Sequence, residues 1–92
     1  MAEELVLNGQ ELWTIDDFHD LFMNRLHFPG HYGRNLDALY DSLMDYVIPP
    51  LTIRWTHYNE SEQLLGDRAQ ALVQVLRDAA AEVEGLEVIV EP

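Results

Sequence analysis

The chain is expected to form a single α/β domain over residues 1–92, a small two-layer fold with a three-stranded parallel sheet and about four helices. Short apolar segments at 5–7, 51–55 and 86–90 have the length of strands, and two helical patterns lie between each strand and the next. Since helical crossovers join strands that run in the same direction, the sheet should be parallel with right-handed connections. Three strands make a small sheet, which the helices should cover on one face.

The first strand, at 5–7, leads into Asn8-Gly9, a pair that is also common in tight hairpin turns. A hairpin into residues 11–13 is therefore the second interpretation. We favour a helix, because Thr14 or Asp16 can cap one that begins immediately afterwards. Phe28-Pro29-Gly30 should end it. Its apolar side chains recur with a helical period: Ile15, Phe18, Leu21, Phe22 and Leu26.

The second helix should begin near Asn35, a good N-cap residue that follows Gly33. Pro49-Pro50 should terminate it, because proline cannot continue a helix. Tyr40 and Met44 lie at the boundary between its apolar and polar sides. The residues expected to face the core are Leu36, Leu39, Tyr40, Leu43 and Val47.

The rest of the chain should supply a strand at 51–55, a short helix at 56–65 closed by Gly66, a long helix and a last strand at 86–90. Asp67 with Gln70 resembles a capping box that opens the long helix, which should end before Gly85. The inward side chains of this helix are expected to be Ala69, Leu72, Val73, Leu76 and Ala80.

Three side chains invite a structural interpretation more than a functional one. Trp13 and Trp55 are expected in the core. His19 lies beside Asp20 on what looks like a polar helix face, so we expect a surface or capping role and no metal ligation.

Composition narrows the possible partners. Seventeen Asp and Glu against five Arg, with no Lys, give 5 − 17 = −12. This charge repels phosphate backbones and anionic lipid, so direct nucleic-acid and membrane ligands are disfavoured and a basic protein is favoured. The absence of cysteine excludes disulfides, thiolate metal sites and a cysteine nucleophile. Together with an N-terminus that lacks signal-peptide features, it favours the cytoplasm.

Asp37, Asp41 and Asp45 follow one another at intervals of four residues and should lie on one stripe of the second helix. Like charges at this spacing weaken a helix. Taken alone, the stripe is more often a solvated face than a binding site. A cationic partner would also explain it.

The segment YGRNLDALYD at 32–41 resembles the barstar family, the intracellular inhibitors of the secreted ribonuclease barnase. Further matches run along almost the whole chain, among them Asn8-Gly9, Pro50-Leu51 and Gln74-Val75. The resemblance implies a barstar-like fold and a non-catalytic protein that binds a basic secreted ribonuclease one to one. In that family the second helix and the loop before it occlude the enzyme's active site.

The resemblance also implies the contact residues, with Asp41 as the acid that enters the catalytic pocket. We also expect Met44, which lies at the boundary between the apolar and polar sides of this helix, to be part of the interface. Carried over by position, the other contacts are His31, Asn35, Asp37, Tyr40, Asp45, Tyr46 and Asp78. We expect no cofactor and no metal.

Several positions depart from the family pattern. His31 replaces an aromatic phenol, Tyr40 and Tyr46 replace tryptophans, and Asp78 replaces a longer acid. In addition, Arg34 and Asp45 stand where the familiar member has glutamate and glycine. These departures leave both barnase and a related basic ribonuclease open as the target.

Three other classes of function compete with that of an inhibitor. A metal-binding module could use Asp37, Asp41 and an imidazole, but aspartates four residues apart do not converge as an oxygen cage does. A hydrolase with paired carboxylates would need a pocket and an acid of raised pKa, and the sequence indicates neither. An acidic DNA mimic that binds another basic protein shares the charge and remains an alternative.

Overall fold

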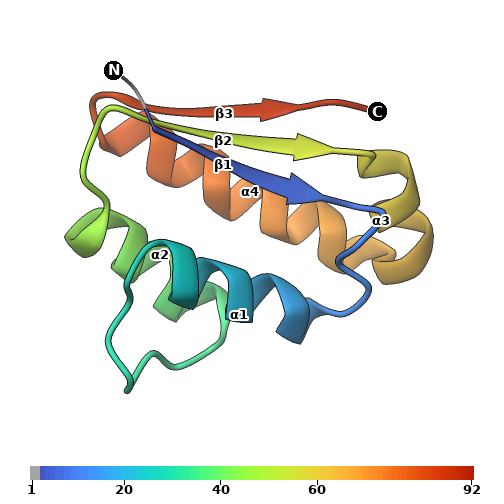
Figure 1. Cartoon of the computed structure of the whole chain (residues 1–92), viewed down its shortest axis with the longest axis horizontal. Helices are drawn as coiled ribbons and strands as arrows, with labels where there is room; N and C mark the ends of the chain where they lie inside the picture. Colours follow the sequence, from blue (N-terminus) through green and yellow to red (C-terminus); the bar gives the residue numbers. More distant parts are fainter. Residues whose placement is uncertain (1–2) are drawn as a thin grey trace.

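The computed structural model describes residues 3–92, which form three strands and four helices in the predicted order. The predicted α/β class and the parallel three-stranded sheet are confirmed. Figure 1 shows the sheet as one layer and the helices as the other. The elements are β1 (Glu3–Asn8), α1 (Ile15–Arg25), α2 (Leu36–Tyr46), β2 (Leu51–Thr56), α3 (Tyr58–Leu65), α4 (Asp67–Glu82) and β3 (Leu86–Val90).

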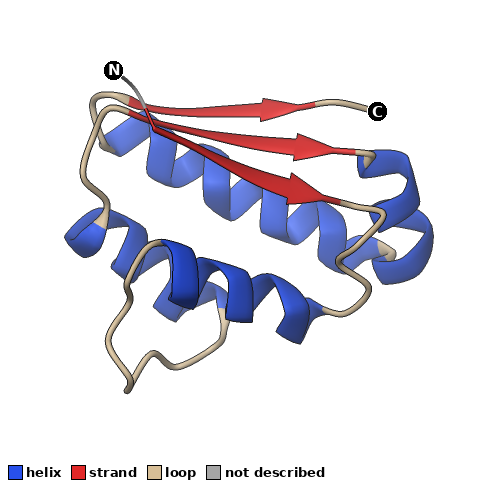
Figure 2. Cartoon of the chain, viewed as in Figure 1, coloured by secondary structure: helices blue, strands red, loops and turns tan. Residues whose placement is uncertain are grey.

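The strand order is β1-β2-β3, and the central register aligns Leu5 with Ile53 and Ile53 with Val88. Side chains alternate between the two faces along each strand, and in β2 every second residue is buried. The helices lie on one side of the sheet (Figure 2). On the opposite side, the Arg54 guanidinium lies 3.1 Å from the Glu4 carboxylate and 3.0 Å from that of Glu91.

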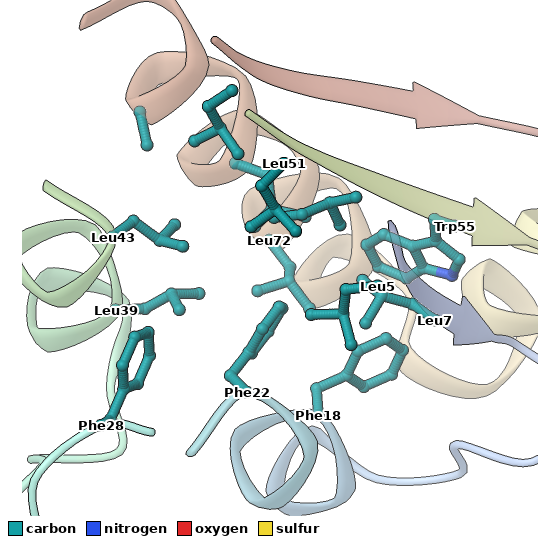
Figure 3. Packing of buried hydrophobic residues seen from close by; sticks show 14 of the residues in the cluster. Leu5, Leu7, Phe18, Phe22, Phe28, Leu39, Leu43, Leu51, Trp55 and Leu72 are labelled. Atoms are coloured by element: carbon teal, nitrogen blue, oxygen red, sulfur yellow. The ribbon is translucent and has the colours of Figure 1, made fainter. Parts of the chain in front are cut away.

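The core fills the space between the sheet and the helices. Figure 3 shows Phe18 and Phe22 of α1 and Leu39 and Leu43 of α2 pointing toward the same interior. The Phe18 ring packs 4.8 Å from the Trp55 ring, between centroids. Since all five side chains have no exposed surface, they position α1 and α2 firmly beneath the strands.

A helix, and not a hairpin, follows β1, as the favoured interpretation predicted. The Glu11 and Leu12 amides both donate to the Asn8 carbonyl, which closes a turn. Thr14 is the N-cap of α1, and with Asp17 it forms a capping box. The helix ends at Arg25, slightly before the predicted Phe28-Pro29-Gly30 stop.

Trp55 is fully buried as predicted, but the prediction of a core position for Trp13 is wrong. Trp13 is 66% exposed, and its indole Nε1 donates to the Gln10 carbonyl at 2.9 Å. Its backbone amide donates to the Asp17 carboxylate of the capping box. These two hydrogen bonds fix the residue just outside the helix start, on the solvent side.

The predicted capping box at Asp67 is also wrong. Gly66 precedes the helix at φ 60°, no side chain caps it, and Asp67 is the first residue of α4. Gln70 donates to the Glu62 carboxylate of α3 instead. The short helix α3 begins two residues later than predicted because β2 continues to Thr56 and His57 turns the chain at φ 54°.

Candidate protein-binding surface

The acidic helix α2 begins as the sequence predicts. Asn35 has an extended backbone, and its Oδ1 accepts a hydrogen bond from the Ala38 amide at 2.8 Å. Leu39 and Leu43 are fully buried, so the opposite side of the helix faces solvent. The packing of Leu39 and Leu43 in the core therefore determines which side chains of α2 a partner can reach.

Asp37, Asp41 and Asp45 are all exposed and lie on one stripe of α2. Among residues 3–92, no Arg or His side chain lies within ion-pairing distance of them, whereas Arg34 and Arg54 pair with other acids. The three carboxylates are thus free for an external cation. Asp37 lies in the first turn, where the helix dipole favours a negative charge.

A groove between α2 and α4 brings a fourth acid to this stripe. It has a volume of about 500 Å³, and it is open to solvent. Asp37 and Asp41 line it from α2 and Asp78 lines it from α4, where Gln74 Nε2 donates to Asp78 Oδ1 at 2.8 Å. Apolar or aromatic side chains complete its lining: Leu36, Tyr40 and Val75. Acids around an apolar lining suit an Arg or Lys side chain with its aliphatic stem.

The predicted contact residues divide into two groups. Four of them share the groove: Asp37, Tyr40, Asp41 and Asp78. The others lie outside its lining: His31, Asn35, Met44, Asp45 and Tyr46. Of these, Met44 is 39% exposed and Tyr46 44%, so both offer apolar area to a partner.

Tyr40 lies at the boundary of the two stripes, as predicted. It is half-buried, because it packs against the core while also lining the groove. The Tyr46 ring packs against that of Phe28, with centroids 6.3 Å apart. Both tyrosines therefore combine packing against a neighbouring side chain with exposed surface.

The loop before α2 packs against His19, a residue whose role the sequence did not indicate. His19 was expected at the surface and is only 2% exposed, which makes that prediction wrong. Its Nδ1 lies 2.6 Å from the Tyr32 hydroxyl. The neighbouring Asp20 suggested a polar face, but position 19 falls four residues after Ile15 and three before Phe22, at the edge of the apolar stripe. That spacing is the feature of the sequence that could have indicated the burial of His19.

Burial changes the acid–base properties of this pair. It lowers the pKa of His19 below its usual 6.5, and the nearby positive charge of Arg34 lowers it further, whereas Asp16 and Asp20 oppose the change. Burial also raises the pKa of Tyr32 to about 12, against a smaller opposing effect of Arg34. Both rings are therefore held in their neutral forms near pH 7.

Within residues 3–92, no three side chains of His, Cys, Asp or Glu are grouped so that they could hold a metal ion. The same part of the chain contains no helix long and apolar enough to cross a membrane. The surface is distinguished instead by its acidic groove and by the aromatic side chains near it.

Comparison with known proteins identifies a matching family and a similar protein. A family model described as Barstar (barnase inhibitor) matches residues 2–91. A protein of Bacillus subtilis (strain 168) named "Putative ribonuclease inhibitor YrdF" is 35% identical over 81 residues, which cover 88% of this chain and 89% of that protein. Both matches agree with the resemblance found in the sequence.

Proposed function

This chain belongs to the barstar family, and we propose that it inhibits a basic extracellular ribonuclease of the guanyl-specific type by tight one-to-one binding. In this proposal α2 and the loop before it occlude the enzyme's active site, and acidic side chains occupy its phosphate site. The protein performs no catalysis. The observation that carries the proposal is the groove that Asp37, Asp41 and Asp78 line from two helices.

The chemistry of a ribonuclease explains why carboxylates serve as inhibiting groups. Such an enzyme holds a phosphodiester with Arg, Lys and His side chains. A carboxylate on a rigid helix can occupy that anion site and offers no bond to cleave. Asp41 has the central role, because it lies in the middle of the stripe between Asp37 and Asp45 and also lines the groove. Binding would relieve the repulsion between these neighbouring charges.

The remaining contact residues enlarge the proposed interface and help to align the two proteins. Tyr40, Met44 and Tyr46 place apolar surface beside the acids, and Tyr adds a polar tip at low entropic cost. His31 and Asn35 belong to the loop side of the interface. Asp78 extends the negative surface to α4.

The whole-chain charge supports the same partner. At −12, the protein should attract a basic enzyme from a distance and accelerate encounter, an effect that salt screens. The proposed cytoplasmic location fits an inhibitor that protects its own cell from an enzyme made for export.

The direct test is a titration of the purified protein into a panel of microbial guanyl-specific ribonucleases, barnase included. We expect RNA cleavage by at least one enzyme to stop near one molar equivalent. A pull-down from secreted and cytosolic fractions should recover a ribonuclease. If no enzyme is inhibited and a DNA-binding protein is captured in place of a nuclease, the acidic surface serves as a DNA mimic and the proposal is wrong.

A further inference from the structure

Arg34 connects the loop between α1 and α2 to α1 through contacts with Asp16 and Asp20. Its Nη2 lies 2.8 Å from the Asp20 carboxylate and 3.5 Å from that of Asp16, and it donates to the Asp16 carbonyl at 3.3 Å. The hydrogen bond with Asp20 is the main reason that the pKa of Arg34 is raised. One guanidinium thus joins two successive turns of α1.

The backbone at Arg34 requires such support. Its φ is +55°, in the left-handed region that a non-glycine residue adopts only at a cost of roughly 1 kcal/mol or more. The next residue, Asn35, is the N-cap of α2 and is itself a proposed contact. Contacts that hold Arg34 therefore act on the residue immediately before the N-cap of α2.

A second contact joins the same loop to α1. The Tyr32 hydroxyl lies 2.6 Å from His19 Nδ1, and His19 is the neighbour of Asp20 in the sequence, although its side chain is buried and that of Asp20 is exposed. The loop is consequently held at residues 32 and 34, immediately before the acidic helix. Neither contact uses a carboxylate of the α2 stripe.

We propose that Arg34 is a positioning residue for partner recognition, which acts through Asp20 and Asp16 by holding the 31–46 segment in its binding conformation. This inference rests on the proposed function. Its physical basis is preorganisation, since a loop ordered before binding pays less conformational entropy in the complex. Direct attraction cannot explain a cation here, because a basic partner would repel Arg34.

The charge of the variants separates positioning from electrostatic steering. Arg34→Ala changes the net charge to −12 − 1 = −13, and Asp20→Ala changes it to −12 + 1 = −11. Steering alone predicts opposite effects on affinity for a basic ribonuclease. Positioning predicts that both variants bind about 3- to 10-fold more weakly, the ordering cost of one or two side chains. The double variant should be no weaker than the poorer single variant, because both break the same contact.

Arg68→Ala is the matched control. Arg68 lines the same small hollow as Arg34, carries the same charge, and among residues 3–92 makes no ion pair. Its loss should leave affinity for the ribonuclease unchanged or slightly improved. A weakening equal to that of Arg34→Ala would show that the loss of any long side chain from this hollow, and not the contact with Asp20, is responsible.

Amide hydrogen exchange of the free protein tests the inference without any partner. Exchange of residues 32–38 should accelerate in Arg34→Ala and Asp20→Ala, and remain unchanged in Arg68→Ala. Unchanged exchange in the first two variants overturns the inference, as does faster exchange with normal affinity. Absence of any inhibited ribonuclease for the parent protein would instead count against the proposed function, and exchange would still decide whether Arg34 orders the loop.

Discussion

The imidazole Nδ1 of His19 and the hydroxyl oxygen of Tyr32 lie 2.6 Å apart, which links α1 to the loop that leads into α2. The two residues are 2% and 7% exposed, and their rings are tilted against each other with centroids 5.5 Å apart. This buried polar contact lies beneath the segment proposed to bind the ribonuclease. Stability and recognition should therefore both depend on it.

Replacing Tyr32 by Phe should destabilise the protein by about 1–2 kcal/mol, since the buried His19 nitrogen loses its partner. Urea unfolding at pH 7 measures this change, with an unaltered denaturant slope. Tyr46→Phe is the control, because Tyr46 is 44% exposed and its hydroxyl makes no hydrogen bond among residues 3–92. Equal losses in the two variants would contradict the assigned importance of the contact.

Stability should depend on pH through the same pair. The folded-state pKa of His19 is below the unfolded value near 6.5, so its contribution is complete above that pH and is lost as pH falls. Tyr32 behaves in the opposite way: its pKa is raised from 10.0 to about 12, so its contribution is complete below pH 10 and is lost as pH rises toward 12. Unfolding free energy should be highest between these limits.

Denaturant titrations from pH 5 to 11 on the parent and on Tyr32→Phe check this profile. The variant should lose the part of the alkaline decline that Tyr32 causes, which for a shift from 10.0 to about 12 is about 3 kcal/mol in full and about half of that at pH 11. Tyr58, whose pKa is raised mainly by burial, should keep a smaller decline in both proteins. If the unfolding free energies of the parent and of Tyr32→Phe decrease equally above pH 10, the Tyr32 phenol does not control stability in that range.

The succession of the elements along the chain and the parallel direction of the strands were predictable because each depends on local patterns. Three apolar segments separated by pairs of helical stripes leave little choice but a parallel sheet. The start of α2 was predictable for the same reason, since Asn35 caps its own helix. By contrast, the cap of α4 was not, because Gln70 finds its partner in α3, at Glu62.

The site shows the same division between local and tertiary information. The spacing of Asp37 and Asp41 predicts their common face from the sequence alone. Their meeting with Asp78 depends on how α2 packs against α4, which no spacing encodes; only the family resemblance indicated that residue. The burial of His19 likewise depends on a loop that folds back over α1, so its neighbour Asp20 was a misleading guide.

Ser61→Ala should cost about 1–3 kcal/mol, because it leaves the indole Nε1 of Trp55 without a partner. Both residues are fully buried, and the bond joins α3 to the central strand at 2.9 Å. Thermal and urea unfolding give the change. Ser42→Ala in α2 is the comparison, since the Ser42 hydroxyl makes no hydrogen bond within residues 3–92 and alanine favours a helix. A Ser42 effect as large as that of Ser61 would argue against the indole bond as the cause.

The rate of association with the target ribonuclease should fall steeply with salt. At about 0.15 M the screening length is about 8 Å, so only charges near the interface still act on the partner. Stopped-flow measurements between low and high salt should show a large decrease in the association rate and a smaller change in the dissociation rate. An association rate that ignores salt would remove electrostatic steering from the proposal and leave the groove contacts to explain affinity alone.

Asp41→Asn should raise stability slightly and weaken binding strongly. Asp41 lies four residues from both Asp37 and Asp45, so removal of its charge relieves two repulsive pairs of roughly 0.2–0.5 kcal/mol each. The amide nearly preserves the shape of the side chain, which isolates charge from packing. In the complex, however, the cations of the enzyme's phosphate site would remain buried without their counter-charge, at a cost of about 3–5 kcal/mol.

Calorimetric melting and inhibition titrations on the same preparations measure the two effects of Asp41→Asn. Glu84→Gln removes one equal charge from an exposed position outside α2 and the groove, so it should change both quantities little. The dissociation rate should carry most of the loss in Asp41→Asn, because a buried contact is broken, while the control should alter mainly the association rate. Parallel losses of stability and binding would make Asp41 a structural residue. A binding loss no larger than that of Glu84→Gln would move the centre of the interface away from α2.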